Sequence, residues 1–277
     1  MPRIKTNADI PDIQNTIDGF PKIAIPKVGV RGIKVPIQVV RKNGTINSAS
    51  ADISIYSDLS PENKGTNMSR YRILVEECVI DKQLNVKELV PTMLDLIKER
   101  LKSQNAYIKV SFDYFITQEA PVSKLKSHME LRATIEGKLV NGEKKLYLTV
   151  KSPYTSLCPC SKEISDYGAH NQRSASFITV EMIPDQMIWI EDLYDVTIKC
   201  ASAPIINGLK RVDEAYQTEL MYENPKFVED MVRDISVELN QHYLDKSIKD
   251  YVIVVEHWES IHTQDAVSIM HANRELR

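Results

Sequence analysis

The sequence predicts an α+β protein built from two similar antiparallel modules, and three observations support this. Several segments alternate apolar and polar residues, as half-buried strands do. Two longer segments carry apolar residues at helical spacing. Asn43-Gly44 and Asn141-Gly142 are residue pairs that tight hairpins prefer. Along the chain these signals give the order strand, strand, helix, strand, strand twice, which predicts antiparallel sheets with helices on one face.

The first module is expected over residues 31–140, after an extended arm at residues 1–30 that contains four prolines. Its expected elements are strands at 37–41 and 51–56, a helix at 88–102 with Pro91 in the first turn, and strands at 108–116 and 129–136. The apolar stripe of that helix consists of Leu89, Met93, Ile97 and Leu101. This stripe is the face expected to pack on the sheet.

The second module is expected over residues 141–277, with strands at 146–150, 176–182, 251–257 and 265–270. Its long helix is expected to begin at Asn224, a residue type favoured at the N-cap, with Pro225 in the first helical position. The stripe of this helix is Phe227, Met231, Ile235 and Leu239.

The composition excludes several classes of protein. With 43% apolar and 26% charged residues the chain is an ordinary globular protein, and a net charge of -3 argues against nucleic-acid or membrane-surface partners. No apolar run reaches 18 residues and the first residues do not resemble a signal peptide, so a cytoplasmic location is expected. Four cysteines are too few for a disulfide scaffold, which leaves metal binding or nucleophilic chemistry as their expected roles.

The most informative segment lies between two expected strands, at residues 156–174. It contains Cys158, Cys160 and His170. Thiolate sulfur and neutral imidazole nitrogen suit zinc and its neighbouring metals. No second CxxC or HxxxH supplies the remaining ligands of a structural site, so the site would be incomplete, as a catalytic metal requires. The alternative is two small buried thiols beside a solvated histidine.

Four ordered motifs make the sequence resemble the bacterial type IB GTP cyclohydrolase I family. They are CPCSKEIS with GAHNQR at residues 158–173, KRVDE at 210–214, NPKFVED at 224–230 and ESIH at 259–262. The resemblance implies the tunnelling fold, with two tandem modules in each subunit. It also implies a homotetramer with active sites at subunit interfaces and GTP as the substrate.

The resemblance assigns a role to five residues. Cys158 and His170 would hold one divalent transition metal, which could be zinc, manganese or ferrous iron, with Glu214 as a carboxylate contact. Glu229 would bind guanine through two parallel hydrogen bonds, and His262 would transfer protons. Taken alone, Glu214 and Glu229 are typical of solvated residues near helix starts.

His257, beside Trp258, is a competing candidate for His262 but lies outside the motif. Cys160 is not expected to be a ligand in the substrate-ready site, although it could bind metal or pair with Cys158 on oxidation.

Several cations are candidates for binding the triphosphate, although cations near loops are usually only solvated. They are Lys162, Arg173 and Lys210, together with Lys64 and Arg70 from a neighbouring subunit. Two positions depart from the family pattern, because Asn67 and Gln264 stand where histidines are common. The departures leave the metal motif intact and put in doubt any role of those two positions.

The implied reaction is hydrolytic opening of the guanine imidazole ring with release of formate, giving 7,8-dihydroneopterin triphosphate for folate synthesis. Three alternatives stay open. One is the cyclic phosphate product of archaeal relatives, and the second is a covalent mechanism in which Cys158 attacks carbon, as in a nitrile reductase of the same fold. The third is a purine- or pterin-binding protein without turnover, which the loss of two histidines would favour.

Overall fold

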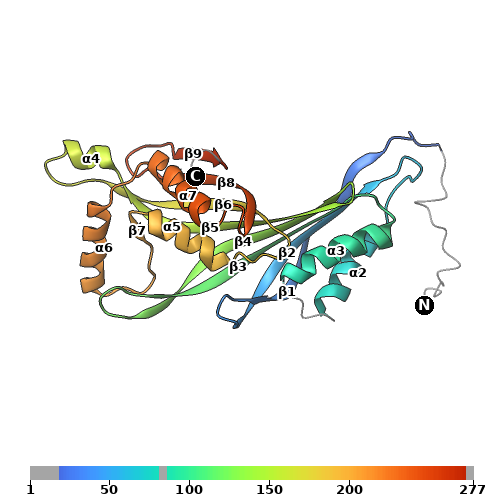
Figure 1. Cartoon of the computed structure of the whole chain (residues 1–277), viewed down its shortest axis with the longest axis horizontal. Coiled ribbons are helices and arrows are strands. Elements are labelled where there is room, and N and C mark those ends of the chain that lie inside the picture. The colour runs from blue at the N-terminus through green and yellow to red at the C-terminus, as the bar shows by residue number, and fades with distance from the viewer. Residues whose placement is uncertain (1–18, 81–85, 273–277) are drawn as a thin grey trace, which may run out of the picture. The chain divides into compact units, whose positions relative to one another are not determined.

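The computed structural model describes residues 19–80 and 86–272, and within them the chain is an α+β protein with a large antiparallel sheet. The first repeat contains β1 (Ile25–Val40), β2 (Ile46–Leu59), α2 (Met68–Ile80), α3 (Val86–Leu101), β3 (Ala106–Glu119) and β4 (Lys126–Val140). The second contains β5 (Glu143–Leu157), α4 (Pro159–Ile164), β6 (Asn171–Met182), α5 (Ile190–Cys200), β7 (Ala203–Pro204), α6 (Arg211–Glu223), α7 (Val228–His242), β8 (Ile248–His257) and β9 (Ala266–His271). These elements are labelled in Figure 1 where there is room.

The predicted repetition of strand, strand, helix, strand, strand is confirmed, with extra helices in each half. Neighbouring strands follow the order β1-β2-β3-β4-β5-β6-β8-β9, and β7 pairs with β5. Both predicted hairpin signals form tight turns, since Gly44, Asn141 and Gly142 have positive φ values of 81°, 52° and 83°. Glycine and asparagine adopt this backbone region at low cost, which explains why these pairs mark the turns.

The start of β1 and the start of α7 differ most from the prediction. Strand β1 begins at Ile25, inside the segment expected as an arm, while residues 1–18 lie outside the described part of the chain. Asn224 ends α6 instead of starting the next helix, because its backbone N–H donates to the Leu220 carbonyl at 3.1 Å. Helix α7 begins at Val228, where the Asp230 carboxylate accepts the Phe227 N–H at 3.0 Å. An aspartate in the first turn therefore caps the helix, and Pro225 lies in the connection.

The chain forms two compact units that interleave along the sequence. Among the described residues, one comprises 19–38, 50–80, 86–110 and 136–145, and the other comprises 39–49, 111–135 and 146–272. The predicted modules, 31–140 and 141–277, are defined by the repeated order of elements, which this grouping by packing does not test, so they stay a prediction.

In the first unit α2 and α3 lie side by side, and α3 packs closely on β4 (Figure 1). A Cβ atom at Gly137 of β4 would stand 2.4 Å from Val90 Cγ1, so only glycine allows this approach. The predicted stripe of α3 is buried at Leu89, Met93 and Ile97.

In the second unit α7 packs on β8 and on α5. The predicted stripe of α7 is buried at Met231, Ile235 and Leu239, whereas Phe227 is 39% exposed because it precedes the helix. Within the described ranges 19–80 and 86–272, no helix has the length and apolar character needed to cross a lipid bilayer.

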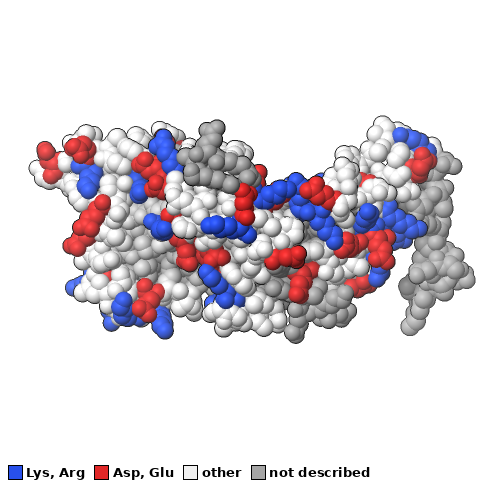
Figure 2. Space-filling model, viewed as in Figure 1, with Lys and Arg blue, Asp and Glu red and all other residues white. Residues whose placement is uncertain are grey.

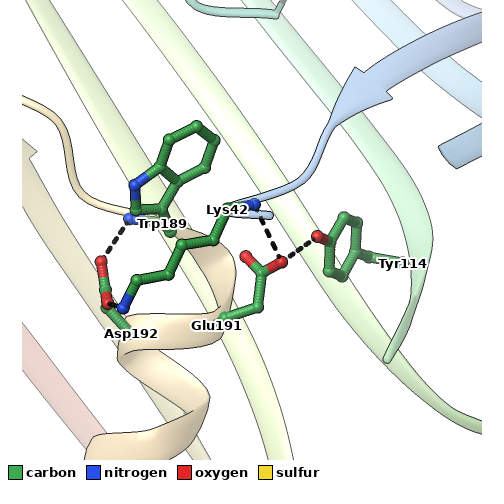
Figure 3. A network of polar contacts seen from close by, with 5 residues as sticks. All are labelled: Lys42, Tyr114, Trp189, Glu191 and Asp192. Atoms are coloured by element: carbon green, nitrogen blue, oxygen red, sulfur yellow. Dashed lines mark hydrogen bonds and ion pairs between the residues drawn. The ribbon is translucent and has the colours of Figure 1, made fainter. Parts of the chain in front are cut away.

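The β1–β2 turn is held against α5 by two carboxylates (Figure 3). Lys42 Nζ lies 2.6 Å from Asp192 Oδ1, and the other oxygen of Asp192 accepts the Trp189 N–H at 2.9 Å. Glu191 accepts hydrogen bonds from the Lys42 backbone N–H and from the Tyr114 hydroxyl. Asp192 raises the pKa of Lys42 by accepting its hydrogen bond. The same aspartate thus caps α5 and fixes the turn.

The β3–β4 turn is held in the same way at the start of α6. One oxygen of the buried Asp213 accepts the N–H groups of Val122 and Ser123 at 2.9 and 2.8 Å, and the other accepts the Lys210 N–H at 2.9 Å. Burial opposes the charge on Asp213, yet these hydrogen bonds hold the pKa of its carboxyl well below its usual range.

Candidate metal and substrate pocket

The antiparallel register of β5, β6 and β8 brings the motif residues together at one end of the sheet. Leu157 pairs with Asn171, so Cys158 and His170 are the next residues beyond the β5–β6 ladder. The Cys158 N–H donates to the His170 carbonyl at 3.1 Å, which fastens the two positions to each other. Ser174 pairs with His257, so the chain after β8 also runs to this end.

A pocket of about 400 Å³ lies here, and four of the predicted site residues line it: Cys158, His170, Glu229 and His262. They come from three places in the chain: the β5–β6 connection, the first turn of α7, and the β8–β9 connection. Cys160 and Gln264 also line this pocket. The Lys226 N–H donates to the Leu157 carbonyl at 3.1 Å, which ties the start of α7 to the β5–β6 connection.

The β5–β6 connection is ordered by its own hydrogen bonds. Ser161 Oγ donates to the Cys158 carbonyl and accepts the His170 N–H, both at 3.1 Å. Cys158 is the N-cap of the short helix α4, and its Sγ atom accepts the Ser161 N–H at 3.5 Å. Ser161 therefore joins the sulfur-bearing and imidazole-bearing segments of one loop.

The side chains around His170 determine which of its nitrogens is available. Gln172 Nε2 donates to Ser156 Oγ at 2.9 Å and to Glu259 Oε1 at 3.4 Å, so its Oε1 is the atom that meets His170 Nδ1 at 3.1 Å. An amide oxygen only accepts, so Nδ1 carries the proton in neutral imidazole. The lone pair is then on Nε2, the arrangement of a metal-binding histidine.

The types of donor atom in this pocket suit a transition metal. Cys158 supplies a soft sulfur ligand, and His170 supplies a nitrogen whose tautomer is fixed by Gln172. Among the residues that the structure describes, no three His, Cys, Asp or Glu side chains lie close enough together to form a complete ligand set. Two donors from this chain leave positions for a third ligand and for water.

Glu229 and His262 are both exposed and stand where a substrate could reach them. His257, in contrast, is 2% exposed, and its Nε2 lies 3.0 Å from the Tyr154 hydroxyl. Burial lowers the pKa of His257 to about 4 and raises that of Tyr154. His257 therefore stays neutral at physiological pH, which makes it less suited than His262 to proton transfer.

Other predicted site residues lie away from this pocket in the single chain. Glu214 is exposed in the first turn of α6, and Lys210 precedes that helix. Lys162 Nζ donates to the Tyr222 carbonyl at 2.5 Å, near the other end of α6. The eight residue steps from Glu214 to Tyr222 correspond to about 12 Å of helix, so Glu214 lies at the far end of α6 from Lys162.

Three predicted phosphate ligands also lie outside this pocket, as does Asn67, which stands where the family commonly has a histidine. Arg173 is on β6, next to Gln172 but on the opposite face of the sheet, because side chains alternate along a strand. Lys64 and Arg70 belong to the other compact unit. Asn67 precedes α2, and its carbonyl accepts the Arg70 N–H at 2.9 Å. The predicted roles of these residues stay predictions.

The prediction from sequence missed Gln172 and Glu259, which belong to the quoted motifs but had no assigned role. Gln172 is 7% exposed, and its amide links Glu259 to His170. A signal was present: Gln172 follows His170 by two residues, the spacing that puts two side chains on one face of a strand.

Comparison with solved structures identifies the class of fold. Uricase from Arthrobacter globiformis matches with a TM-score of 0.53 and 9% identity, over 90% of this chain and 93% of that one. This is a likeness of fold alone, and it agrees with the tunnelling fold that the sequence resemblance implied.

Comparison with families identifies the particular group. The model of "Type I GTP cyclohydrolase folE2" matches residues 10–268. GTP cyclohydrolase FolE2 of Geobacter sp. (strain M21) is 42% identical over 264 residues, which are 95% of each chain. GTP cyclohydrolase FolE2 of Geobacter metallireducens is 43% identical over 267 residues, covering 96% of this chain and 98% of that one. The chain belongs to the type I GTP cyclohydrolase FolE2 family.

Proposed function

We propose that this chain is a GTP cyclohydrolase of the type IB subclass. It opens the imidazole ring of guanine by hydrolysis, releases formate and gives 7,8-dihydroneopterin triphosphate, in the first step of folate biosynthesis. The observation that carries the proposal is that Cys158, His170, Glu229 and His262 line one pocket in a member of this family.

Glu229 binds the guanine base. Its carboxylate has two acceptor oxygens, which match the two parallel N–H donors of the guanine ring nitrogen and exocyclic amine. The first turn of α7 is anchored by Asp230 and by the Lys226 backbone, which fixes the backbone position from which Glu229 reaches the pocket. Because the base is held at two points, the rest of the ring has one orientation relative to Cys158 and His170.

His262 moves the protons of the reaction. It donates a proton to the ring nitrogen as the bond to C8 breaks, and it recovers a proton from water. A second water then releases C8 as formate, and the later closure of the pterin ring returns one water, so the overall reaction consumes one water for each formate. Cys158 and His170 hold one divalent transition metal, either zinc, manganese or ferrous iron. When bound, such a metal lowers the pKa of water from about 15.7 to about 7 and thereby supplies hydroxide at neutral pH.

The site is completed by neighbouring copies in a homotetramer. Glu214 and Lys210 lie away from the pocket in the single chain, and Lys64 and Arg70 belong to the other compact unit. In this proposal they reach the metal and the triphosphate of an adjacent copy. Co-expression of Cys158→Ala with Glu214→Ala tests the arrangement, because mixed tetramers contain sites with both native residues and recover activity. Absence of recovery in mixed tetramers of verified composition would contradict it.

The decisive experiment measures formate released from GTP by the metal-loaded protein. We expect release that stops on chelation and in Cys158→Ala, while Cys160→Ser retains most of the activity. Activity that survives complete metal removal would favour the alternative in which Cys158 is a nucleophile. GTP binding without formate under zinc, manganese and ferrous iron would indicate a binding protein, and the product mass distinguishes the linear triphosphate from a cyclic phosphate.

A further inference from the structure

A second pocket, of about 370 Å³, lies on the sheet face opposite the Cys158 pocket. It is lined from β4, β5, β6 and the residue after β8 by Arg132, Lys151, Arg173 and Trp258. The Trp258 N–H donates to the Arg173 carbonyl at 3.1 Å. The two pockets therefore use consecutive residues on β6 and at the end of β8. Gln172 and His257 face the Cys158 pocket, and Arg173 and Trp258 face the second pocket.

Two of the three cations in this second pocket are held in place by neighbours. Lys151 Nζ lies 5.2 Å from the centre of the Phe177 ring and 5.4 Å from that of Trp258, which restrains a side chain that is otherwise flexible. Arg132 Nη1 lies 2.7 Å from Asp113 Oδ1, a contact that orients the guanidinium and leaves its other N–H donors free for a ligand. These cations are thus positioned before any ligand arrives.

The charge of the pocket is positive after its acids are counted. Arg132, Lys151 and Arg173 contribute three positive charges, and Asp113 and Glu130 contribute two negative ones. The whole chain carries a net charge of -3, and on the face seen in Figure 2 residues of both signs are interspersed. Attraction for an anion at this pocket is therefore local and built by these residues.

We propose that this pocket binds an oligophosphate anion, with Arg173 as its main ligand and Lys151 and Arg132 as supporting cations. Arginine pairs with phosphate oxygens through two parallel N–H bonds, and lysine adds a point charge. Binding of an oligophosphate at this pocket does not depend on the proposed function. The anion could have two sources: free oligophosphate, or the triphosphate tail of GTP bound at an adjacent copy. Only the second source rests on the proposed function.

The test is calorimetric titration of the full-length protein with inorganic tripolyphosphate at low ionic strength. We expect Arg173→Ala and Lys151→Gln to weaken binding about tenfold or more, because each removes a charge-assisted contact. Arg233→Ala removes the same charge from the exposed side of α7 and should leave the affinity within about twofold, as expected for a distant screened charge. Cys158→Ala controls for chelation of the metal and should bind as the native protein does.

The outcomes separate the proposal from its rivals. Absence of binding by the native protein overturns it, as does equal weakening in Arg173→Ala and Arg233→Ala. Loss of binding in Cys158→Ala with retention in Arg173→Ala also overturns it, since the anion would then bind the metal. If tripolyphosphate binding needs Arg173 and Arg173→Ala also raises KM for GTP at unchanged kcat, the tail of GTP is the source. An unchanged KM with the same binding loss assigns free oligophosphate. The dependence of tripolyphosphate binding on Arg173 is measured without turnover and stands even if no formate is released from GTP.

Discussion

The connections between strands differ between the two repeats in length and in what they contact. In the first repeat the β1–β2 and β3–β4 connections are short, residues 41–45 and 120–125, and both are fastened by carboxylates at helix starts. In the second repeat residues 158–170 and 258–265 make the equivalent connections, and both line the Cys158 pocket. The residues that line this pocket are found where the turn has been extended, and the unextended turns are held by fold-stabilising hydrogen bonds.

Removing a donor from the extended β5–β6 connection should have the largest effect. We expect His170→Ala to lower formate release at least about a thousandfold, because a metal site with two donors from one chain loses half of them. Thermal stability should change little, since the side chain is only half-buried. His128→Ala, on the exposed face of β4, is the matched control and should behave as native. A His170→Ala enzyme with native activity would refute the role of this connection.

Substitutions of the two histidines near the end of β8 should differ in their effect on the pH–rate profile. We expect His262→Asn to lower kcat about a hundredfold or more and to abolish the alkaline limb of the pH–rate profile, because a general acid must be protonated to act. His257→Gln should keep that limb, because burial holds the pKa of His257 at about 4, below the assay range of pH 5 to 9. Loss of the alkaline limb in His257→Gln but not in His262→Asn would reverse the assignment.

Substitution of Gln172, which contacts the same connection, should have a smaller effect. Gln172→Leu removes the amide that fixes the tautomer of His170, and we expect metal affinity to fall about 10- to 100-fold. Affinity is measured by competition with a chromogenic chelator, so the result does not depend on turnover. Gln241→Leu, an exposed change near the end of α7, should leave it unaltered. An unchanged affinity in Gln172→Leu would show that His170 needs no such support.

The order of elements was predictable from the sequence because each element carries its own local pattern. The apolar stripes of α3 and α7 and the Asn-Gly turns are examples, since periodicity and positive φ are properties of neighbouring residues. The start of α7 was not predictable from Asn224. Both Asn224 and Asp230 are residue types that can cap the start of a helix, and in the structure it is the Asp230 carboxylate that accepts the Phe227 N–H.

The pocket could be predicted only in part for a similar reason. Cys158 and His170 share one loop and were identifiable together, whereas the convergence of Gln172 with Glu259 depends on the β6–β8 register. Register is a property of two distant segments, and sequence period alone does not determine it. The separation of Arg173 from its neighbour Gln172 depends on which face of β6 is covered, which is also decided by distant contacts.

Loosening the β3–β4 turn should reduce stability. Asp213→Asn weakens three hydrogen bonds at a buried position, and we expect the urea midpoint to fall at least about twice as far as in Asp230→Asn, which weakens a single cap. The pKa of Asp213 is depressed by folding, so its contribution is present at neutral pH and is lost as the pH falls below about 4. The difference between native and Asp213→Asn stability should therefore shrink in acid. A difference that is constant from pH 7 to pH 3 would contradict the charge-based account.

The β1–β2 turn should give the smallest effect. Lys42→Met removes the ion pair with Asp192, and because Lys42 is half exposed and screened by solvent we expect a loss of about 1 kcal/mol or less. Folding raises the pKa of Lys42, so the contribution is complete below about pH 10 and is lost as the pH rises through the raised value. Urea unfolding at pH 7 and pH 9 should show the same difference between the two proteins, whereas 1 M salt should reduce it. Formate release should stay native, because a turn that only fastens α5 supplies nothing to the pocket; a fall in kcat would mean that the short connections also support the chemistry.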